Sequence, residues 1–170
     1  MHSVVSCLPP MRCKDFRRRA KVRCVSDERV GEFGRNLRVM VYSDDRLVRR
    51  DVLLALGKRP AFDLPFLDFV ECATEAGVIS LIDKGGFDLL ILDGEAAPAG
   101  GMGIARQLKD EIFNCPPILL LIGRPQDAWL ATWSRAEAVA AHPINAVLLA
   151  ESVAGLLRAR LARLSVTSTP

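Results

Sequence analysis

The sequence lacks the marks of several common protein classes. Its five cysteines in 170 residues are too sparse for a disulfide framework, and the three in the N-terminal segment lack the CxxC pairing of a zinc site. Apolar runs such as Ile118–Ile122 are far shorter than the roughly 20 residues of a membrane-spanning helix. No GxGxxG or GxxxxGK motif follows the apolar run Leu37–Tyr42, which argues against a nucleotide-binding enzyme.

What is present favours one globular domain preceded by a basic arm. Half of the residues are hydrophobic and a quarter are charged, which excludes a disordered chain. The net charge of +3 is uneven: residues 1–36 carry nine Lys/Arg and four Asp/Glu, and the remainder carries fourteen and sixteen. We interpret 1–36 as a disordered arm, or as sequence upstream of a misassigned start, and expect no nucleic-acid partner for the acidic remainder.

Apolar strands alternate with amphipathic helices over residues 37–164, and a short tail follows at 165–170. Strands apolar on both sides need helices on both faces of the sheet, so the pattern predicts an α/β fold with a parallel sheet. The predicted strands are Leu37–Tyr42, Phe66–Val70, Leu89–Leu92, Ile118–Ile122 and Ala138–Ala141. The predicted helices centre on Leu47–Leu56, Ala73–Lys84, Ile104–Ile112, Gln126–Glu137 and Leu148–Leu161.

Polar residues follow the predicted strands and should converge at one edge of the sheet. They are Ser43, Asp44, Asp45, Asp93, Gly123, Arg124 and His142. Converging carboxylates can hold Mg²⁺, or one of them can attack phosphorus to give an aspartyl phosphate. Asp44 and Asp45 could instead cap the following helix.

This layout resembles the CheY-like receiver domain of bacterial two-component response regulators. The resemblance rests on the stretch from Val39 to Arg50, on Phe87–Asp93, and on the positions of Gly101 and Leu108. It implies a flavodoxin-like (βα)5 doubly wound fold with strand order 2-1-3-4-5. It also implies that Asp93 is the phosphoacceptor, and that Asp44, Asp93 and the backbone carbonyl of Glu95, with Asp45 as a further candidate, are Mg²⁺ ligands.

The sequence departs from the family at four positions. Ser43 replaces an acid beside the metal, and Ile122 replaces a hydroxyl that binds the phosphoryl group. His142 replaces a lysine, and histidine is mostly neutral at pH 7. Val139 replaces the aromatic residue of the switch. Because phosphoryl transfer depends on such charges and donors, we expect weak or lost Mg²⁺ binding, no required cofactor and slow or absent phosphorylation, which defines a pseudo-receiver.

No output domain is expected after the last helix, so the protein should act by protein–protein interaction and not as an enzyme. The sequence is similar to orphan single-domain receiver-like proteins of mycobacteria and related actinobacteria. That similarity implies an accessory subunit of proton-pumping NADH:quinone oxidoreductase (respiratory complex I), cytoplasmic or peripheral at the cytoplasmic face of the plasma membrane. The alternative is a working phosphoacceptor in a two-component phosphorelay, with a histidine kinase as partner.

Two tryptophans mark a candidate partner surface. Trp129 and Trp133 lie four residues apart, so a helix would place them on one face, and tryptophan is enriched at interface hot spots. Arg124 and Arg135 flank them and could pair with an acidic partner. The alternative is that both tryptophans pack inside the protein or cap the edge of the sheet, since large aromatic side chains are usually mostly buried.

Overall fold

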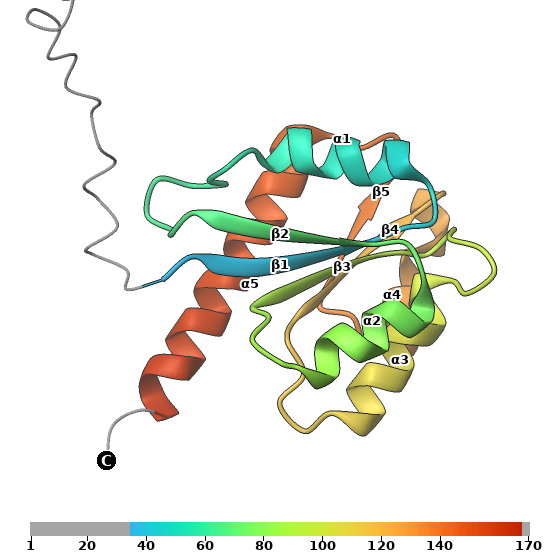
Figure 1. Cartoon of the computed structure of the whole chain (residues 1–170). Helices are drawn as coiled ribbons and strands as arrows, with labels where there is room; N and C mark the ends of the chain where they lie inside the picture. Colours follow the sequence, from blue (N-terminus) through green and yellow to red (C-terminus); the bar gives the residue numbers. More distant parts are fainter. Residues whose placement is uncertain (1–34, 168–170) are drawn as a thin grey trace, which may run out of the picture.

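The computed structural model describes residues 35–167, so residues 1–34 of the predicted arm 1–36, and residues 168–170, lie outside the described residues. Five parallel strands form a single sheet with the order β2-β1-β3-β4-β5. Helices cover both of its faces (Figure 1). The predicted flavodoxin-like fold and its strand order are therefore confirmed.

The elements alternate along the chain as predicted. The strands are β1 Leu37–Tyr42, β2 Leu67–Cys72, β3 Leu89–Asp93, β4 Ile118–Ile122 and β5 Ala138–Ala141. The helices are α1 Arg46–Leu56, α2 Glu75–Asp83, α3 Gly101–Glu111, the short 3₁₀ helix η2 Pro125–Ala128, α4 Trp129–Ser134 and α5 Ala146–Thr167. The last helix thus includes three residues of the segment that we took as a tail from 165.

The two faces of the sheet have separate cores because side chains alternate along each strand. On one face, Val39 and Val41 of β1 pack with α1 and α5. On the other, Met40 and Tyr42 pack with α2 and α3. All five residues of β3 and of β4 are buried. The central strands therefore read as continuous apolar runs, as expected for a parallel sheet covered on both sides.

The predicted helix Gln126–Glu137 is wrong in its extent. Arg135 adopts a left-handed conformation with φ of 61°, and its backbone N–H bonds to the carbonyls of Ala131 and Thr132, which ends α4. Glu137 then leads into β5, because its backbone N–H donates to Ile118 and its carboxylate accepts from the Ile118 N–H at 2.7 Å. The result is one short α-helix after a 3₁₀ turn.

Candidate functional site

Asp93 ends β3 and lies at the carboxyl edge of the sheet, where β1 and β4 also end. Its side chain is buried, with 3% of the residue exposed. One carboxylate oxygen accepts a hydrogen bond from the Ser43 hydroxyl at 2.7 Å, and the other accepts from the Glu95 backbone N–H at 3.0 Å. The predicted convergence of the β1 and β3 ends is therefore observed as a direct contact.

Ser43 is fully buried and connects Asp93 to the start of α1. Its hydroxyl oxygen accepts from the Asp45 N–H at 3.1 Å while the hydroxyl donates to Asp93. Asp45 in turn caps α1, because its side chain accepts from the Leu47 N–H at 2.7 Å. The capping role weighed for Asp45 is thus the one observed, and a neutral hydroxyl fills the space beside Asp93.

Close backbone packing holds the loop between β3 and α3 over the same edge. A Cβ at Gly101 would lie 2.6 Å from the Asp93 carbonyl oxygen, so α3 can begin this close to β3 only with glycine. The Tyr42 hydroxyl donates to the Ala99 carbonyl at 2.6 Å and ties the loop to β1. Cis peptide bonds precede Pro98 in this loop and Pro143 after β5.

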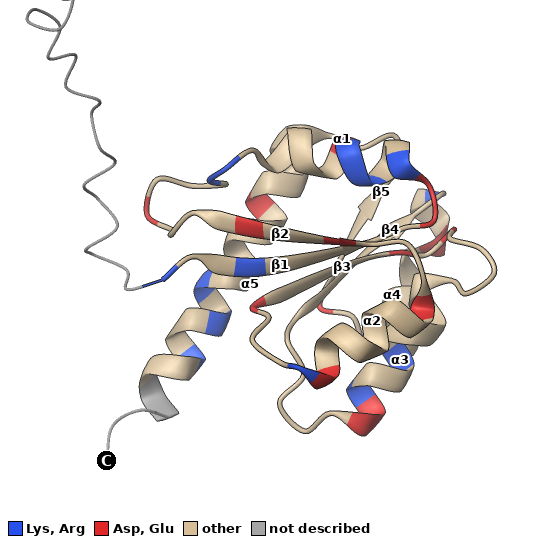
Figure 2. Cartoon of the chain, viewed as in Figure 1, with Lys and Arg blue, Asp and Glu red and all other residues tan. Residues whose placement is uncertain are grey.

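Negative charge gathers at this edge. Figure 2 shows acidic residues in the β1–α1 loop, at the end of β3 and at the start of α2. The pKa of the Tyr42 phenol is raised above 10.0, first by burial and then by Asp44 and Glu75. In the described part of the chain no Lys, Arg or His side chain forms an ion pair with Asp93.

The predicted metal ligands do not form a strong site for a divalent ion. Asp44 is exposed, Asp45 caps α1, and both oxygens of Asp93 already accept hydrogen bonds. Among residues 35–167, no three His, Cys, Asp or Glu side chains cluster as metal ligands would. Hard cations favour several carboxylate oxygens, and Ser43 supplies none.

The other departures from the family pattern, Ile122, Val139 and His142, lie in β4, in β5 and directly after β5. Ile122, the last residue of β4, is buried with 1% of the residue exposed and packs in the α2–α3 core. His142 follows β5, and its backbone N–H donates to the Ile122 carbonyl at 2.8 Å. Val139 and His142 line a groove of about 250 Å³ between β5 and α5, together with the exposed Leu148.

The side chain of Glu95 has a position that the sequence did not indicate. We assigned only its backbone carbonyl to the edge, yet its carboxylate accepts from the Gly123 N–H at 3.3 Å. Glu95 therefore bridges the β3–α3 loop to the end of β4. No sequence signal places this side chain, because the contact depends on the path of the β3–α3 loop.

The two tryptophans are on the surface. Trp129 is 64% exposed and Trp133 51%, so the alternative of two interior tryptophans is wrong. Arg124 is also exposed. Arg135 is engaged within the protein, because it pairs with Asp110, which also binds Arg106 at 2.9 Å. Of the two flanking arginines, Arg124 is the one that makes no ion pair within residues 35–167.

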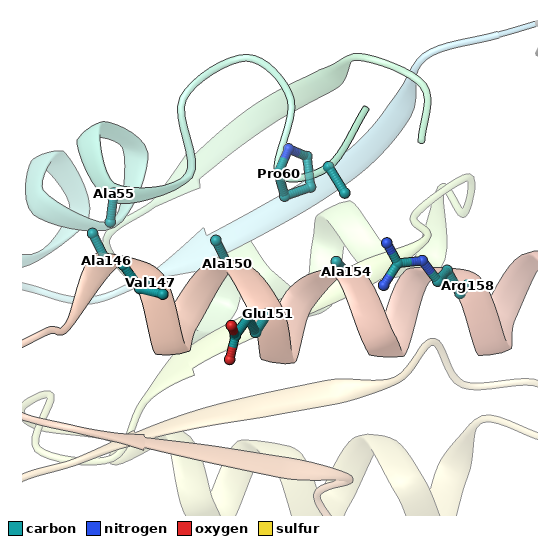
Figure 3. Close-up of a pocket in the computed structure, with 9 residues that line it drawn as sticks. Ala55, Pro60, Ala146, Val147, Ala150, Glu151, Ala154 and Arg158 are labelled. Atoms are coloured by element: carbon teal, nitrogen blue, oxygen red, sulfur yellow. The ribbon is translucent and has the colours of Figure 1, made fainter. Parts of the chain in front are cut away.

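A second hollow has neither Asp93 nor Ser43 in its lining. A groove of about 430 Å³ runs between α5 and the loop after α1. Figure 3 shows Ala150 and Ala154 of α5 turned toward the loop that carries Pro60, while Glu151 points away. Its one cationic lining residue, Arg158, is paired with Asp63 at 2.7 Å. The groove thus offers alanine surface and no group of converging polar side chains.

No helix in the described part of the chain is both long enough and apolar enough to cross a bilayer. No family model matches the chain. The chain is 60% identical over 111 residues to uncharacterized response regulatory proteins from two strains of Mycobacterium tuberculosis, and the match spans 65% of this chain and 84% of each relative.

Solved structures show the same fold at low sequence identity. The chemotaxis response regulator CheY4 of Vibrio cholerae superposes with a TM-score of 0.61 at 17% identity, over 72% of this chain and 99% of that one. A CheY-like receiver domain protein from Methanospirillum hungatei gives 0.61 at 15% identity, over 76% and 99%. Together with the close mycobacterial relatives, these findings show that the chain belongs to the response regulators with a CheY-like receiver domain.

Proposed function

We propose that this protein is a pseudo-receiver, which acts by binding a protein partner and not as an enzyme. The observation that carries the proposal is the 2.7 Å hydrogen bond from the buried Ser43 hydroxyl to Asp93. Through this bond, one oxygen of the carboxylate at the phosphoacceptor position already accepts from a neutral group of the protein itself. A receiver that works by phosphorylation needs a site at Asp93 that is open to a cation and a phosphoryl group.

The surroundings of Asp93 support slow or absent phosphoryl transfer. The transferred phosphoryl group spreads negative charge over three oxygens, and catalysis consists mainly of stabilising that charge. At the positions expected to do so, Ile122 presents a buried hydrocarbon and His142 presents a side chain without the permanent charge of lysine. Ser43 in place of an acid lowers the attraction for a divalent cation.

The partner surface that we favour contains the exposed tryptophans. Trp129 and Trp133 occupy the first and fifth positions of α4, so they share one face of the helix. Exposed tryptophans on one helix face are uncommon in surfaces that stay in water, and tryptophan dominates many binding hot spots. The groove beside β5, with Leu148 exposed at its rim, adds apolar area.

The partner that we propose is respiratory complex I, with the protein bound peripherally at the cytoplasmic face of the membrane. The support for this step is the resemblance to the receiver-like proteins of actinobacteria described above. In this proposal the domain binds the complex through exposed side chains such as Trp129 and does not enter the bilayer itself.

Affinity isolation from detergent-solubilised membranes tests this proposal. The tagged full chain should retain NADH dehydrogenase subunits in stoichiometric amounts after a salt wash, as identified by mass spectrometry. The double variant Trp129→Ala/Trp133→Ala should lose them. Phe113→Ala is the matched control, because Phe113 is a fully exposed aromatic residue on the α3–β4 loop. A full chain that retains no membrane complex would refute the proposed partner.

A phosphorylatable regulator is the second candidate, because Asp93 is kept at the end of β3 and the close relatives are named response regulatory proteins. In this case a histidine kinase would be the partner. Acetyl phosphate with Mg²⁺ should then add a phosphoryl group to the wild type and not to Asp93→Asn. Rapid and stoichiometric labelling of the wild type would favour this candidate over the pseudo-receiver.

A further inference from the structure

The Glu95 carboxylate lies against the end of β4, next to Asp93. Its backbone N–H donates to one Asp93 oxygen at 3.0 Å, and its side chain returns across the edge to accept from the Gly123 N–H at 3.3 Å. Asp93 and Leu121 are register partners in β3 and β4, so Gly123 is two residues past the residue paired with Asp93. Glu95 therefore joins the two loops that flank the Asp93 side chain.

This contact occupies a backbone group that is suited to binding an anion. Backbone N–H groups at the edge of a sheet can bind anions, and here a carboxylate of the protein itself accepts from the Gly123 N–H. The distance of 3.3 Å is longer than the usual 2.7–3.2 Å range, so the bond is weak. Glu95 is exposed to solvent and can leave Gly123 without unpacking the core.

The absence of a side chain at Gly123 is what admits the carboxylate. A Cβ there would lie 3.0 Å from both Cδ and Oε1 of Glu95, which is tighter than nine in ten real Cβ contacts, so the carboxylate would have to shift. The φ angle of Gly123 does not require glycine, since positive values are confined to Gly57, Gly85 and Gly86 among the described glycines. Space for Glu95 is therefore the local reason for glycine at this position.

We propose that Glu95 is an internal competitor for the anion-binding N–H of Gly123, and that it restrains the reaction of Asp93 with phosphoryl donors. This inference rests on the proposed function, since it explains how the same edge is kept unreactive. An incoming phosphoryl group must displace the Glu95 carboxylate from Gly123 and also overcome its negative charge. Ser43 and Glu95 thus act on opposite sides of Asp93.

The reaction that Glu95 restrains is transfer from an acyl phosphate. An Asp93 carboxylate oxygen forms a bond to phosphorus, the bond from phosphorus to the acyl oxygen breaks, and the carboxylate of the donor leaves with the electron pair. The Ser43 hydroxyl must give up its bond to Asp93 if the attacking oxygen is Oδ2. The oxygens of the transferred group can accept from the Gly123 N–H only after Glu95 has left.

Labelling of the full chain by acetyl phosphate with Mg²⁺, followed by intact mass, tests the competition. Glu95→Ala should be labelled about fivefold faster than the wild type, the upper range for one exposed charge. Glu95→Gln keeps the size of the side chain and should fall between the two. Glu75→Ala is the matched control: Glu75 is an exposed acid at the same edge that also acts on Tyr42 and does not contact Gly123. Asp93→Asn in the Glu95→Ala background should abolish labelling.

Three outcomes would overturn the inference. Equal acceleration by Glu75→Ala and Glu95→Ala would assign the effect to general charge. Equal rates for Glu95→Ala and the wild type would show that the carboxylate does not restrain the site. If no variant were labelled, removal of the Glu95 carboxylate would not have released any reaction at Asp93, and the inference would be wrong. None of these outcomes touches the partner proposal, which the isolation of a membrane complex tests separately.

Discussion

β3 has a buried carboxylate at each end, and the two are stabilised in opposite ways. Asp88 precedes the strand and is 1% exposed, and Asp93 ends it and is 3% exposed. Asp88 receives two hydrogen bonds from the Arg35 guanidinium, at 2.7 and 2.6 Å, and one from the Arg38 N–H at 2.9 Å. Asp93 receives one from a neutral hydroxyl and one from a backbone N–H.

This difference separates a structural acid from the acid at the position of the family's phosphoacceptor, and we call the end of β3 that carries Asp93 the reactive end. A buried carboxylate is costly unless it is paired and hydrogen-bonded, and the hydrogen-bonded pair with Asp88 raises the pKa of the Arg35 guanidinium. Asp88 thereby fastens Arg35, two residues before β1, to the start of β3. Asp93 has no cation partner among residues 35–167, so its negative charge stays available.

Removal of the structural acid should have the largest effect. Asp88→Ala deletes three hydrogen bonds and leaves the Arg38 N–H without its acceptor, so we expect a loss of about 3 kcal/mol in the free energy of unfolding. Urea unfolding of the full chain measures it. Asp68→Ala, which removes an exposed acid of β2, should change stability by less than about 0.5 kcal/mol. Similar values for the two variants would contradict the structural role of Asp88.

A second acid beside Asp93 should make the reactive end depend on a cation. Ser43→Asp places two carboxylates in contact in a buried position, so we expect a loss of about 2 kcal/mol in stability without divalent ions. Millimolar Mg²⁺ should restore most of it by binding between the acids. The control Ser43→Ala should lose about 1 kcal/mol through the missing hydrogen bond, with no response to Mg²⁺. Thermal unfolding with Mg²⁺ or with a chelator checks both, and a Ser43→Asp variant that ignores Mg²⁺ would count against this account.

Neutralisation of Asp93 should not lower the free energy of unfolding. Asn at position 93 can still accept from the Glu95 N–H, and it removes a buried charge that lacks a cation, so Asp93→Asn should be neutral or stabilising by up to about 1 kcal/mol. Changes of opposite sign in the free energy of unfolding for Asp93→Asn and Asp88→Ala would establish the contrast between the two ends of β3. A large destabilisation by Asp93→Asn in urea unfolding would mean that Asp93 is structural too.

The sequence predicts the reactive end better than the structural end. Apolar runs in β3 and β4 mark buried parallel strands, and the polar residue after each run must lie at the shared carboxyl edge, so the contact of Ser43 with Asp93 follows from topology. The pair of Arg35 with Asp88 was missed because Arg35 falls in the segment that we took as a basic arm. Its signal was there, since Arg35 and Asp88 each stand just before neighbouring strands.

Side-chain direction accounts for what could not be predicted. Nothing in the sequence says that the Glu95 carboxylate turns back to Gly123, because this depends on the path of the β3–α3 loop. The end of α4 at Arg135 was missed for a related reason. A left-handed arginine is an uncommon helix end. Two residues later, the Glu137 carboxylate accepts a hydrogen bond from the Ile118 N–H at 2.7 Å, which places the chain at the start of β5.

The smallest predicted effect is a shift in the titration of one phenol. Tyr42 is the single tyrosine of the chain, so phenolate absorbance reports it alone. Burial and the acids at the reactive end raise its pKa above 10.0, and in the unfolded chain it should return to about 10. The stability linked to this shift is fully present below pH 10, because both states are then protonated, and it is lost as the pH rises through the folded pKa.

The acids contribute to that shift in a defined order. Burial is the largest cause and Asp44 the next, so Asp44→Asn should lower the titration midpoint of the folded protein only partly toward 10. Asp88→Asn should leave the midpoint where it is, because Asp88 is not among the acids that act on Tyr42. A spectrophotometric titration of the three proteins checks this. An equal response to Asp44→Asn and Asp88→Asn would mean that the phenol senses overall charge and not the local excess of acids at the end of the sheet where Asp93 lies.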